Sequence, residues 1–326
     1  MITLGQVIAS LGLRPVLIDV GASGTYPEIW RRIAAQSVYV GFDPDLREIR
    51  EASEGEFQRA VSVNAAVTPD PATRNVQFYF TRSPFCSSTL APDTDALDAY
   101  LFADLFAVDG ESTVHATTLA EVVAQLNLPG IDWLKSDSQG TDLRLLNSLP
   151  DALRSRVLAV DIEPGLIDAY RGEDLFVTAH ADIVRQGFWL SNLRVQGALR
   201  MRQSTLAWLR SREPWLTKEF IQKHFRTSPA WCEATYLRTV DALVASRGDR
   251  DGFSMLWTFS LLEDQFGFAL DLAAEYERRF GVDRGWRLLM EQTLSAAQRR
   301  SFRPLMSRAG EILRRVSRKL RRWVHR

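Results

Sequence analysis

The chain of 326 residues is poor in the residues that form metal sites and disulfide frameworks. It has only two cysteines, Cys86 and Cys232, and four histidines. Neither cysteine is spaced from another Cys or His as in a metal-binding motif, so we expect no bound metal. Two widely separated cysteines do not suggest a disulfide framework, and we expect a cytoplasmic protein.

Long hydrophobic runs are also missing. No apolar stretch reaches the roughly 18 residues that a membrane-spanning helix needs. The N-terminal segment lacks the basic start of a signal peptide. The chain is 46% hydrophobic and longer than a typical domain. We therefore expect a soluble globular protein of about two domains.

Residues 16–45 contain the most informative pattern of the sequence. The apolar run Val16–Ile18 ends in Asp19, and a second apolar run, Val38–Phe42, ends in Asp43. A glycine-containing turn and a helical pattern lie between the two runs. This order predicts a strand, a turn, a helix and a second strand of a parallel sheet.

The turn and the two carboxylates indicate a nucleoside-containing cofactor. Gly21, Ala22 and Gly24 let the backbone approach a ligand closely, and Asp43 can accept hydrogen bonds from ribose hydroxyls. A dinucleotide-binding turn has three glycines as G-x-G-x-x-G, whereas this turn has two as G-x-x-G. Asp19 would repel a pyrophosphate and would suit the cationic amino-acid end of S-adenosylmethionine. An ordinary βαβ unit with surface carboxylates is the alternative.

Four sequence motifs occur in a fixed order over about residues 4–195. They read IDVGASG, then GFDPD, then VNAAVT from Val63, and DWLKSDSQGTDLRLLNSL from Asp132. In order and spacing they resemble the FkbM-type methyltransferases. The resemblance implies an α/β fold, the Rossmann-like class I methyltransferase sheet with helices on both faces. It also implies methyl transfer from S-adenosylmethionine to a hydroxyl of a small molecule or glycan, with Asn64 or Ala65 on the adenine side.

The segment after the expected fourth strand, Asp132–Ser136, carries the candidate chemistry. The resemblance matches Asp137, Gln139 and Gly140 to a family segment of Asp, then Glu or Gln, then Gly, and it puts Asp142 at the position of a further acid. Asp137 is the predicted catalytic carboxylate, because it could accept or orient the proton of an acceptor hydroxyl. Gln139 cannot act as a base, so we expect it to position the substrate.

Four other side chains are weaker candidates. Asp161 and Glu163 alternate with apolar residues at the end of the expected strand Val157–Glu163, and they can face the crevice or the solvent. His180 could act as a general base or contact the substrate, although a surface histidine is the simpler interpretation within its predicted helix. Lys135 matches a family position, or its ammonium pairs with a neighbouring carboxylate.

Strand and helix patterns divide the chain into three expected parts. Residues 1–197 form the methyltransferase-like domain. Its other expected strands are Ala60–Val67, an inserted antiparallel strand Val76–Arg82, and a last strand Phe188–Val195 that pairs antiparallel. Residues 198–298 form an α-helical region without a strand, including a helical segment Trp231–Ser246. Residues 299–326 form a basic amphipathic tail helix.

The tail stands out by its charge, because the whole chain is neutral while residues 299–326 have 11 Lys and Arg against one acid. Apolar residues recur there at intervals of three and four. Such a helix can pack on the protein's own acidic body, lie on the anionic inner face of a membrane, or bind a partner or nucleic acid. A nucleic-acid methyltransferase is disfavoured, since no N-P-P-Y-like motif is present and the rest of the chain is acidic.

Two classes of function fit these patterns. The first is an S-adenosylmethionine-dependent O-methyltransferase that acts on a sugar, glycan or small metabolite. The second is a scaffold or binding protein of the same fold, catalytically weak or inactive, that is recruited to a membrane-associated glycan assembly. Gln139 in place of the more usual Glu is compatible with the scaffold, whereas Asp19, Asp43 and Asp137 favour an active enzyme. No pattern identifies the acceptor or the oligomeric state.

Overall fold

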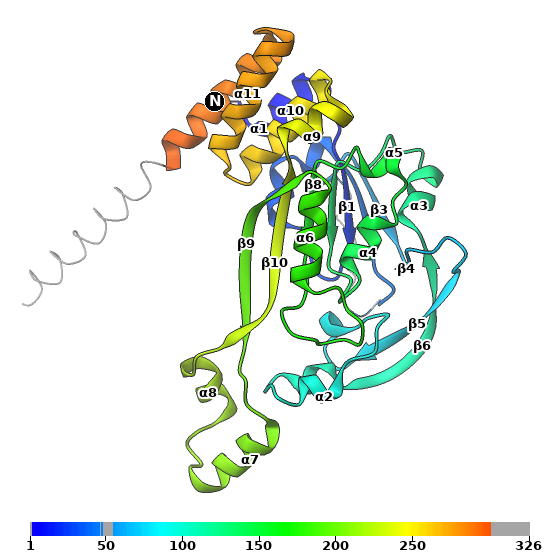
Figure 1. The fold of residues 1–326 in the computed structure, drawn as a ribbon, viewed down its shortest axis with the longest axis vertical. Coiled ribbons are helices and arrows are strands. Elements are labelled where there is room, and N and C mark those ends of the chain that lie inside the picture. Colours follow the sequence, from blue (N-terminus) through cyan, green and yellow to red (C-terminus); the bar gives the residue numbers. More distant parts are fainter. Residues whose placement is uncertain (1, 46, 48–54, 301–326) are drawn as a thin grey trace, which may run out of the picture.

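A seven-stranded, mostly parallel sheet runs through the middle of the molecule in the order β3-β2-β1-β7-β8-β10-β9 (Figure 1). The computed structural model describes residues 2–45, 47 and 55–300. Five strands are parallel, and β10 is antiparallel to both of its neighbours. The strands are β1 (Val16–Val20), β2 (Val38–Phe42), β3 (Arg59–Val63), β7 (Trp133–Ser136), β8 (Ala159–Ile162), β9 (Phe188–Ala198) and β10 (Ser228–Arg238).

A second, three-stranded sheet has the order β4-β6-β5. The strand expected over Ala60–Val67 is divided between the two sheets, because β3 ends at Val63 and β4 (Ala66–Val67) pairs with β6 (Val108–Thr117). The antiparallel insertion is confirmed, since β5 (Asn75–Thr81) pairs antiparallel with β6.

The strand β10 is the main departure from the sequence-based expectation. Residues 198–298 were expected to contain no strand, and this prediction is wrong because β10 lies there. The helix expected over Trp231–Ser246 is wrong for the part that belongs to β10 and is confirmed from Val240 onward, where α9 (Val240–Arg247) begins. Ala230, Cys232 and Ala234 are buried in β10 and alternate with less buried residues, which is the period of a strand. The expected antiparallel pairing of β9 is confirmed, and β10 is its partner.

The connection from β1 to β2 contains no α-helix, contrary to the helical pattern of its sequence. Two 3₁₀ turns, η1 (Glu28–Arg32) and η2 (Ala34–Gln36), take its place. Trp30 in η1 is fully buried, and its ring lies 5.9 Å from that of Trp133 in β7. The Trp133 ring in turn lies 4.8 Å from Phe259 of α10 (Arg250–Leu262). The late helix α10 therefore covers sheet surface next to the short connection.

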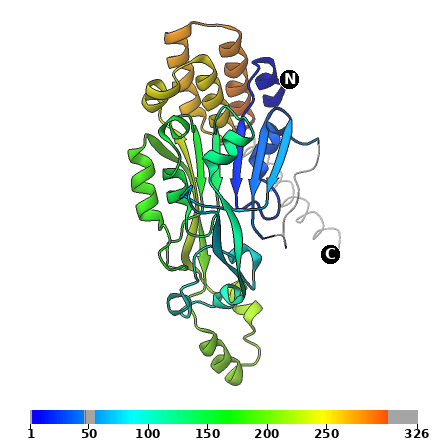
Figure 2. The same cartoon turned by 90° about the vertical axis from the view of Figure 1, so that its right-hand side faces the viewer.

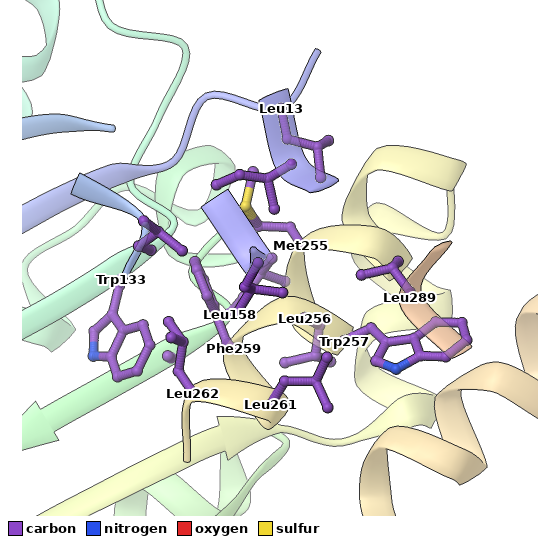
Figure 3. Packing of buried hydrophobic residues seen from close by; sticks show 14 of the residues in the cluster. Leu13, Trp133, Leu158, Met255, Leu256, Trp257, Phe259, Leu261, Leu262 and Leu289 are labelled. Atoms are coloured by element: carbon purple, nitrogen blue, oxygen red, sulfur yellow. The ribbon is translucent and has the colours of Figure 1, made fainter. Parts of the chain in front are cut away.

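Helices cover both faces of the sheet, as the α/β prediction requires. One face packs against α3 (Leu119–Gln125), α4 (Asp142–Asn147) and α6 (Phe176–Arg185). Thr118 caps α3 in a capping box with Glu121. The other face packs against α1 (Leu4–Ser10), α10, α11 (Phe266–Phe280) and helical residues 284–300, and Figure 3 shows this apolar core.

Residues 198–298 contribute to three separate places rather than to one helical layer. The strand β10 joins the sheet. The helices α10 and α11 cover one face of the sheet, with α9 (Val240–Arg247) nearby. The helices α7 (Gln203–Arg212) and α8 (Lys218–His224) lie at the far end of the β9–β10 ribbon. Figures 1 and 2 place α7 and α8 at the end of the molecule opposite to α9–α11. The expected tail helix lies outside the described residues from residue 301 onward. Within the described residues, no helix is both long and apolar enough to cross a bilayer.

Candidate functional site

The strand order reverses between β1 and β7, and the predicted site residues lie at the carboxyl ends of these strands. The chain leaves β1 in one direction toward β2 and β3, whereas β7 leads to β8 on the other side. Ligands bind at such a switch point in open α/β sheets. The amides of Gly21 and Ala22 donate to the Phe42 carbonyl at 2.9 and 3.0 Å, and the Asp137 amide donates to Val20 at 2.9 Å. Three strand ends are thereby held together.

A first cavity opens at this switch point. It brings together predicted residues from four motifs, Gly21, Asp43, Ala65, Asp137 and Gln139. Three carboxyl groups line it, those of Asp43, Asp45 and Asp137, and no Lys, Arg or His is among its lining residues in the described part of the chain. Arg47, outside this lining, pairs with the Asp45 carboxylate. The carboxyl groups of Asp43 and Asp137 therefore suit the cavity to a ligand that is positively charged or neutral.

Asp43 lies in this cavity at the end of β2, as expected, and its side chain is 7% exposed. Its Oδ1 accepts a hydrogen bond from the Asp45 amide at 2.8 Å. Burial raises the pKa of Asp43 to about 6. The Asn64 side chain donates to the Asp43 carbonyl at 2.9 Å, so Asn64 holds the loop, while Ala65 lines the cavity.

A row of polar residues crosses the middle of the sheet on the face that α10 covers. Asp19 on β1 lies opposite Lys135 on β7, which lies opposite Asp161 on β8. The Lys135 Nζ atom lies 2.8 Å from Asp19 Oδ1 and donates to the Gly21 carbonyl at 3.1 Å. Tyr39 donates its hydroxyl to Asp19 at 3.1 Å. The pairing predicted for Lys135 is confirmed, and it links Asp19 to the turn.

The charges in this row compensate one another. Burial disfavours the Lys135 ammonium, but the nearby carboxylates of Asp19 and Asp137 favour it, and the pKa of Lys135 is raised. Burial raises the pKa of Asp19, an effect that Lys135 opposes. Asp19 therefore does not present a free negative charge to the cavity, in contrast to the sequence-based argument. Trp133 donates its indole N–H to Asp161 at 2.8 Å, and burial raises the pKa of Asp161 to about 6.

Gln139 is held in a strained conformation beside Asp137. Its φ of 57° lies in the left-handed region, which is costly for a residue with a side chain. Its Nε2 donates to Asp137 Oδ1 at 2.5 Å, and the Tyr170 hydroxyl donates to its Oε1 at 2.6 Å. Ser88 donates to its carbonyl at 2.7 Å. Both ends of the Gln139 amide are thus used to position Asp137 and Tyr170.

Asp142 is fully buried and shapes the turn after β7. It accepts hydrogen bonds from the hydroxyls of Ser136 and Ser138 at 2.7 and 2.6 Å, and from the Ser138 amide at 2.9 Å. Its other oxygen accepts the Glu163 amide at 3.3 Å. Asp142 therefore ties the end of β8 to the turn that carries Asp137.

Glu163 and Asp137 are interacting carboxyl groups, and the pKa of each is raised. Burial raises the pKa of Glu163 to about 9, with further contributions from Asp137 and Glu233, so Glu163 carries a proton at neutral pH. Burial also raises the pKa of Asp137, but Lys135 opposes this effect. Of the two, Asp137 is the one that lies beside the strand position of Lys135, since it directly follows β7.

Two further cavities adjoin this pair. The second lies over the polar row, and its lining includes Lys135, Asp137, Asp161, Glu163 and Glu233. The third, of about 250 Å³, adjoins Gln139 and Glu163. Its walls are mainly apolar and aromatic, and none of its lining residues in the described ranges is basic. They include Phe102, Leu105, Phe106, Ile167, Tyr170 and Trp231.

The aromatic wall of the third cavity was not predicted from the sequence. Phe102 lies nearly parallel to Trp231 with ring centres 6.2 Å apart, and Phe106 lies 5.2 Å from Phe102 and 5.6 Å from Tyr170. These residues come from an insertion, a loop and the unpredicted strand β10, so no local motif marks them. Glu173 also lines this cavity, and burial raises its pKa to about 7.

His180 lies away from these cavities. It is in α6, its Nδ1 atom lies 3.1 Å from the Tyr236 hydroxyl, and its ring stacks on Phe176 at 5.4 Å. None of the cavities described above includes His180 in its lining. Gly24, with φ of 80°, shapes the turn without lining the first cavity.

Comparison with models of known protein families gives no match for this sequence, and comparison with curated proteins gives none either. The resemblance to the FkbM-type methyltransferases therefore stays a prediction from the four motifs.

Proposed function

We propose that the protein is an S-adenosylmethionine-dependent O-methyltransferase. The observation that carries the proposal is the first cavity, which lies at the switch point of the sheet and is lined by the carboxyl groups of Asp43, Asp45 and Asp137. Asp45 is paired with Arg47, so the electrostatic argument depends on Asp43 and Asp137. S-adenosylmethionine carries a sulfonium and an ammonium, and carboxylates favour such a ligand electrostatically.

The same features argue against a dinucleotide. A pyrophosphate is held by the N-terminus of a helix that directly follows the glycine turn. Here the first helical turn, η1, begins at Glu28, and it is a 3₁₀ turn. The carboxyl groups of the first cavity would repel the phosphates. The fit to the cationic cofactor therefore rests on the whole lining rather than on Asp19, whose charge Lys135 compensates.

The residues at the strand ends have distinct proposed roles. Asp43 would hold the ribose, Ala65 would lie on the adenine side, and the backbone at Gly21 and Ala22 would leave room for the methionine end. When bound, the cofactor supplies a methyl group on a positively charged sulfur. Asp19 would act through Lys135, by fixing the ammonium against the Gly21 carbonyl.

Asp137 and Glu163 would act on the acceptor. Asp137, next to the Lys135 ammonium, would accept the proton that the hydroxyl loses as the new C–O bond forms. Glu163 is protonated at neutral pH, so it could donate a hydrogen bond to the acceptor and orient it. Gln139 would keep the Asp137 carboxylate in position.

The third cavity is the proposed acceptor site. It adjoins Glu163 and Gln139, and its aromatic walls suit a flat, apolar ring face. The absence of a basic residue in its described lining disfavours a phosphorylated or carboxylated acceptor. A neutral sugar unit or a small neutral metabolite with a free hydroxyl fits this description.

The scaffold hypothesis remains the second candidate, because Gln139 takes the place of a more usual Glu. In the scaffold the cavities would bind no S-adenosylmethionine or would bind it without transfer. The strained φ and three hydrogen bonds of Gln139 favour the enzyme, since strain of this kind is commonly retained at functional sites.

The test is calorimetric titration of the purified full chain with S-adenosylhomocysteine and, separately, with NADH. We expect saturable binding of S-adenosylhomocysteine alone. Asp137→Asn keeps an oxygen that can accept from Gln139, so this variant should bind S-adenosylhomocysteine like the unaltered protein but lose methyl transfer to any acceptor found. Binding of NADH alone, or of neither compound, would contradict the proposed cofactor, and retained transfer by Asp137→Asn would remove its catalytic role.

A further inference from the structure

The helical tip of the molecule, defined as residues 199–226 with α7 and α8, exposes large aromatic side chains. Trp208 is 54% exposed, Trp215 is 61% exposed and Phe225 is 45% exposed. The tip lies at the end of the β9–β10 ribbon, away from α9–α11 (Figures 1 and 2). Its aromatic residues can therefore reach a surface that the body of the protein does not touch.

Trp208, Trp215 and Phe225 lie outside the small hydrophobic core of the tip. Its own small core consists of Leu206 of α7 and Ile221 of α8, packed on Leu101 and Leu199. Thr217 caps α8 by accepting from the Phe220 amide. This core does not bury Trp208 or Trp215, so it does not explain why two large indole rings are exposed to water. Exposed apolar groups of this kind mark interaction surfaces.

The tip is also positively charged on an otherwise negative body. Residues 199–226 contain seven Lys and Arg against two acids. With +5 there and +10 in residues 299–326, the rest of the neutral chain carries −15. Part of the basic set anchors the tip, since Arg202 pairs with Asp98 and Lys218 pairs with Asp104. Other members, Arg210 and Arg212 among them, are exposed.

Trp side chains combined with Arg and Lys are typical of proteins that bind at the interface of an anionic bilayer. The indole ring sits at the level of the headgroups, and each basic residue near the surface is attracted by anionic lipid. The tip meets both conditions, and none of the described helices is suited to span the bilayer. We propose that the tip binds the surface of anionic membranes through Trp208, Trp215 and the neighbouring basic side chains.

The ring environments favour a membrane over single-stranded nucleic acid. A base stacks on an open aromatic face, but one face of Trp208 is covered by the Arg212 guanidinium, 4.5 Å from the ring centre. Trp215 meets Phe220 edge to face at 5.2 Å. A nucleic-acid strand that extended past the tip would also meet the negative body, whereas a membrane can contact the tip alone.

The test is sedimentation of the full chain with vesicles of phosphatidylcholine that contain phosphatidylserine, and with vesicles of phosphatidylcholine alone. We expect binding to the anionic vesicles that weakens as salt is added. Trp208→Ser with Trp215→Ser should lower the affinity about tenfold or more, and Arg210→Gln with Arg212→Gln should lower it about thirtyfold. The matched control is Val177→Ser with Leu270→Ser, two exposed apolar residues elsewhere, which should change nothing.

Residues 301–326 are also basic, so vesicle binding of a shortened chain that ends at residue 300 is measured in parallel. Loss of vesicle binding in the two tip variants, with an unchanged circular dichroism spectrum and melting temperature, supports the inference. The inference is overturned if the unaltered chain ignores anionic vesicles, or if only removal of residues 301–326 abolishes binding. It is equally overturned if the tip variants lose binding to oligo-dT while vesicle binding is unchanged. None of these outcomes depends on the proposed methyl transfer.

Discussion

A Cβ atom placed on Gly21 would lie 2.1 Å from the backbone carbonyl oxygen of Asp137. The turns that follow β1 and β7 therefore touch through their backbones, at the point where the strand order reverses. Gly21 also has a φ of 73°, which residues with side chains rarely adopt. One glycine thus sets the distance between the proposed methionine end of the cofactor site and the predicted catalytic carboxylate.

Gly21→Ala should destabilise the protein and disrupt the first cavity. The left-handed φ costs about 1–2 kcal/mol for alanine, and the overlap with Asp137 should add about 1–3 kcal/mol. Gly24→Ala is the matched control, because Gly24 has a φ of 80° but open space around its Cβ position. Urea unfolding of both variants measures the difference. Equal losses of unfolding free energy would show that the contact with Asp137 is unimportant.

Binding of S-adenosylhomocysteine should depend on pH through Asp43. Its pKa is raised by burial to about 6, so the carboxyl is protonated below this pH and ionised above it. Ribose hydroxyls donate hydrogen bonds to the ionised form, so affinity should rise as pH increases from 5 to 7. Such a bond to a charged group is worth about 1.5–3 kcal/mol. Calorimetric titrations of Asp43→Asn should show weaker binding without this pH dependence.

The control for that experiment is Asp70→Asn, since Asp70 is an exposed carboxylate in a turn away from the first cavity. It should keep both the affinity and the pH dependence of the unaltered protein. An Asp43→Asn variant with the same pH dependence would assign the titration to another group and remove Asp43 from the ribose site.

The parallel sheet and the positions of Asp43 and Asp137 could be predicted because they depend on local patterns. Buried parallel strands are continuous apolar runs, and their carboxyl ends meet at one edge of the sheet. The pairing of Asp19 with Lys135 has a weaker signal of the same kind. Side chains two positions apart in a strand point to the same face, so Asp19 shares a face with Leu17, and Lys135 shares a face with Trp133. Leu17 lies opposite Trp133 in the sheet, and therefore Asp19 and Lys135 lie on the same face.

The remaining features depend on contacts between distant segments. The strand β10 was missed because two of its buried positions, Ala230 and Ala234, are alanines, which favour helices over strands. The helix expected between β1 and β2 is replaced by 3₁₀ turns, in a region where Trp30 and Trp133 pack next to α10. Amphipathic spacing shows that a helix has an apolar face, but it does not say which sheet surface that face covers.

Glu163 should make the protein less stable as pH rises. Its pKa is about 9 in the folded protein against an ordinary value of 4.5. Between these values the folded state holds a proton that the unfolded state has lost, so the free energy of unfolding falls by up to about 1.4 kcal/mol per pH unit. Glu163→Gln cannot titrate, so its stability relative to the unaltered protein should increase from pH 5 to pH 9. Urea unfolding across this pH range measures the difference in unfolding free energy between Glu163→Gln and the unaltered protein. A difference that does not change with pH would contradict a protonated Glu163.

The Lys135–Asp19 pair should stabilise the fold far more than a surface pair does. Asp19 is almost fully buried, so Lys135→Met leaves an uncompensated carboxylate and should cost about 3–5 kcal/mol of unfolding free energy. Asp19→Asn in the same chain removes that charge and should recover a large part of the loss, because Asn can still accept from Tyr39. Arg31→Met, which breaks the exposed pair with Glu28, should leave the free energy of unfolding nearly unchanged. A Lys135→Met variant as stable as Arg31→Met, or a double variant without recovery, would show that Lys135 does not compensate Asp19.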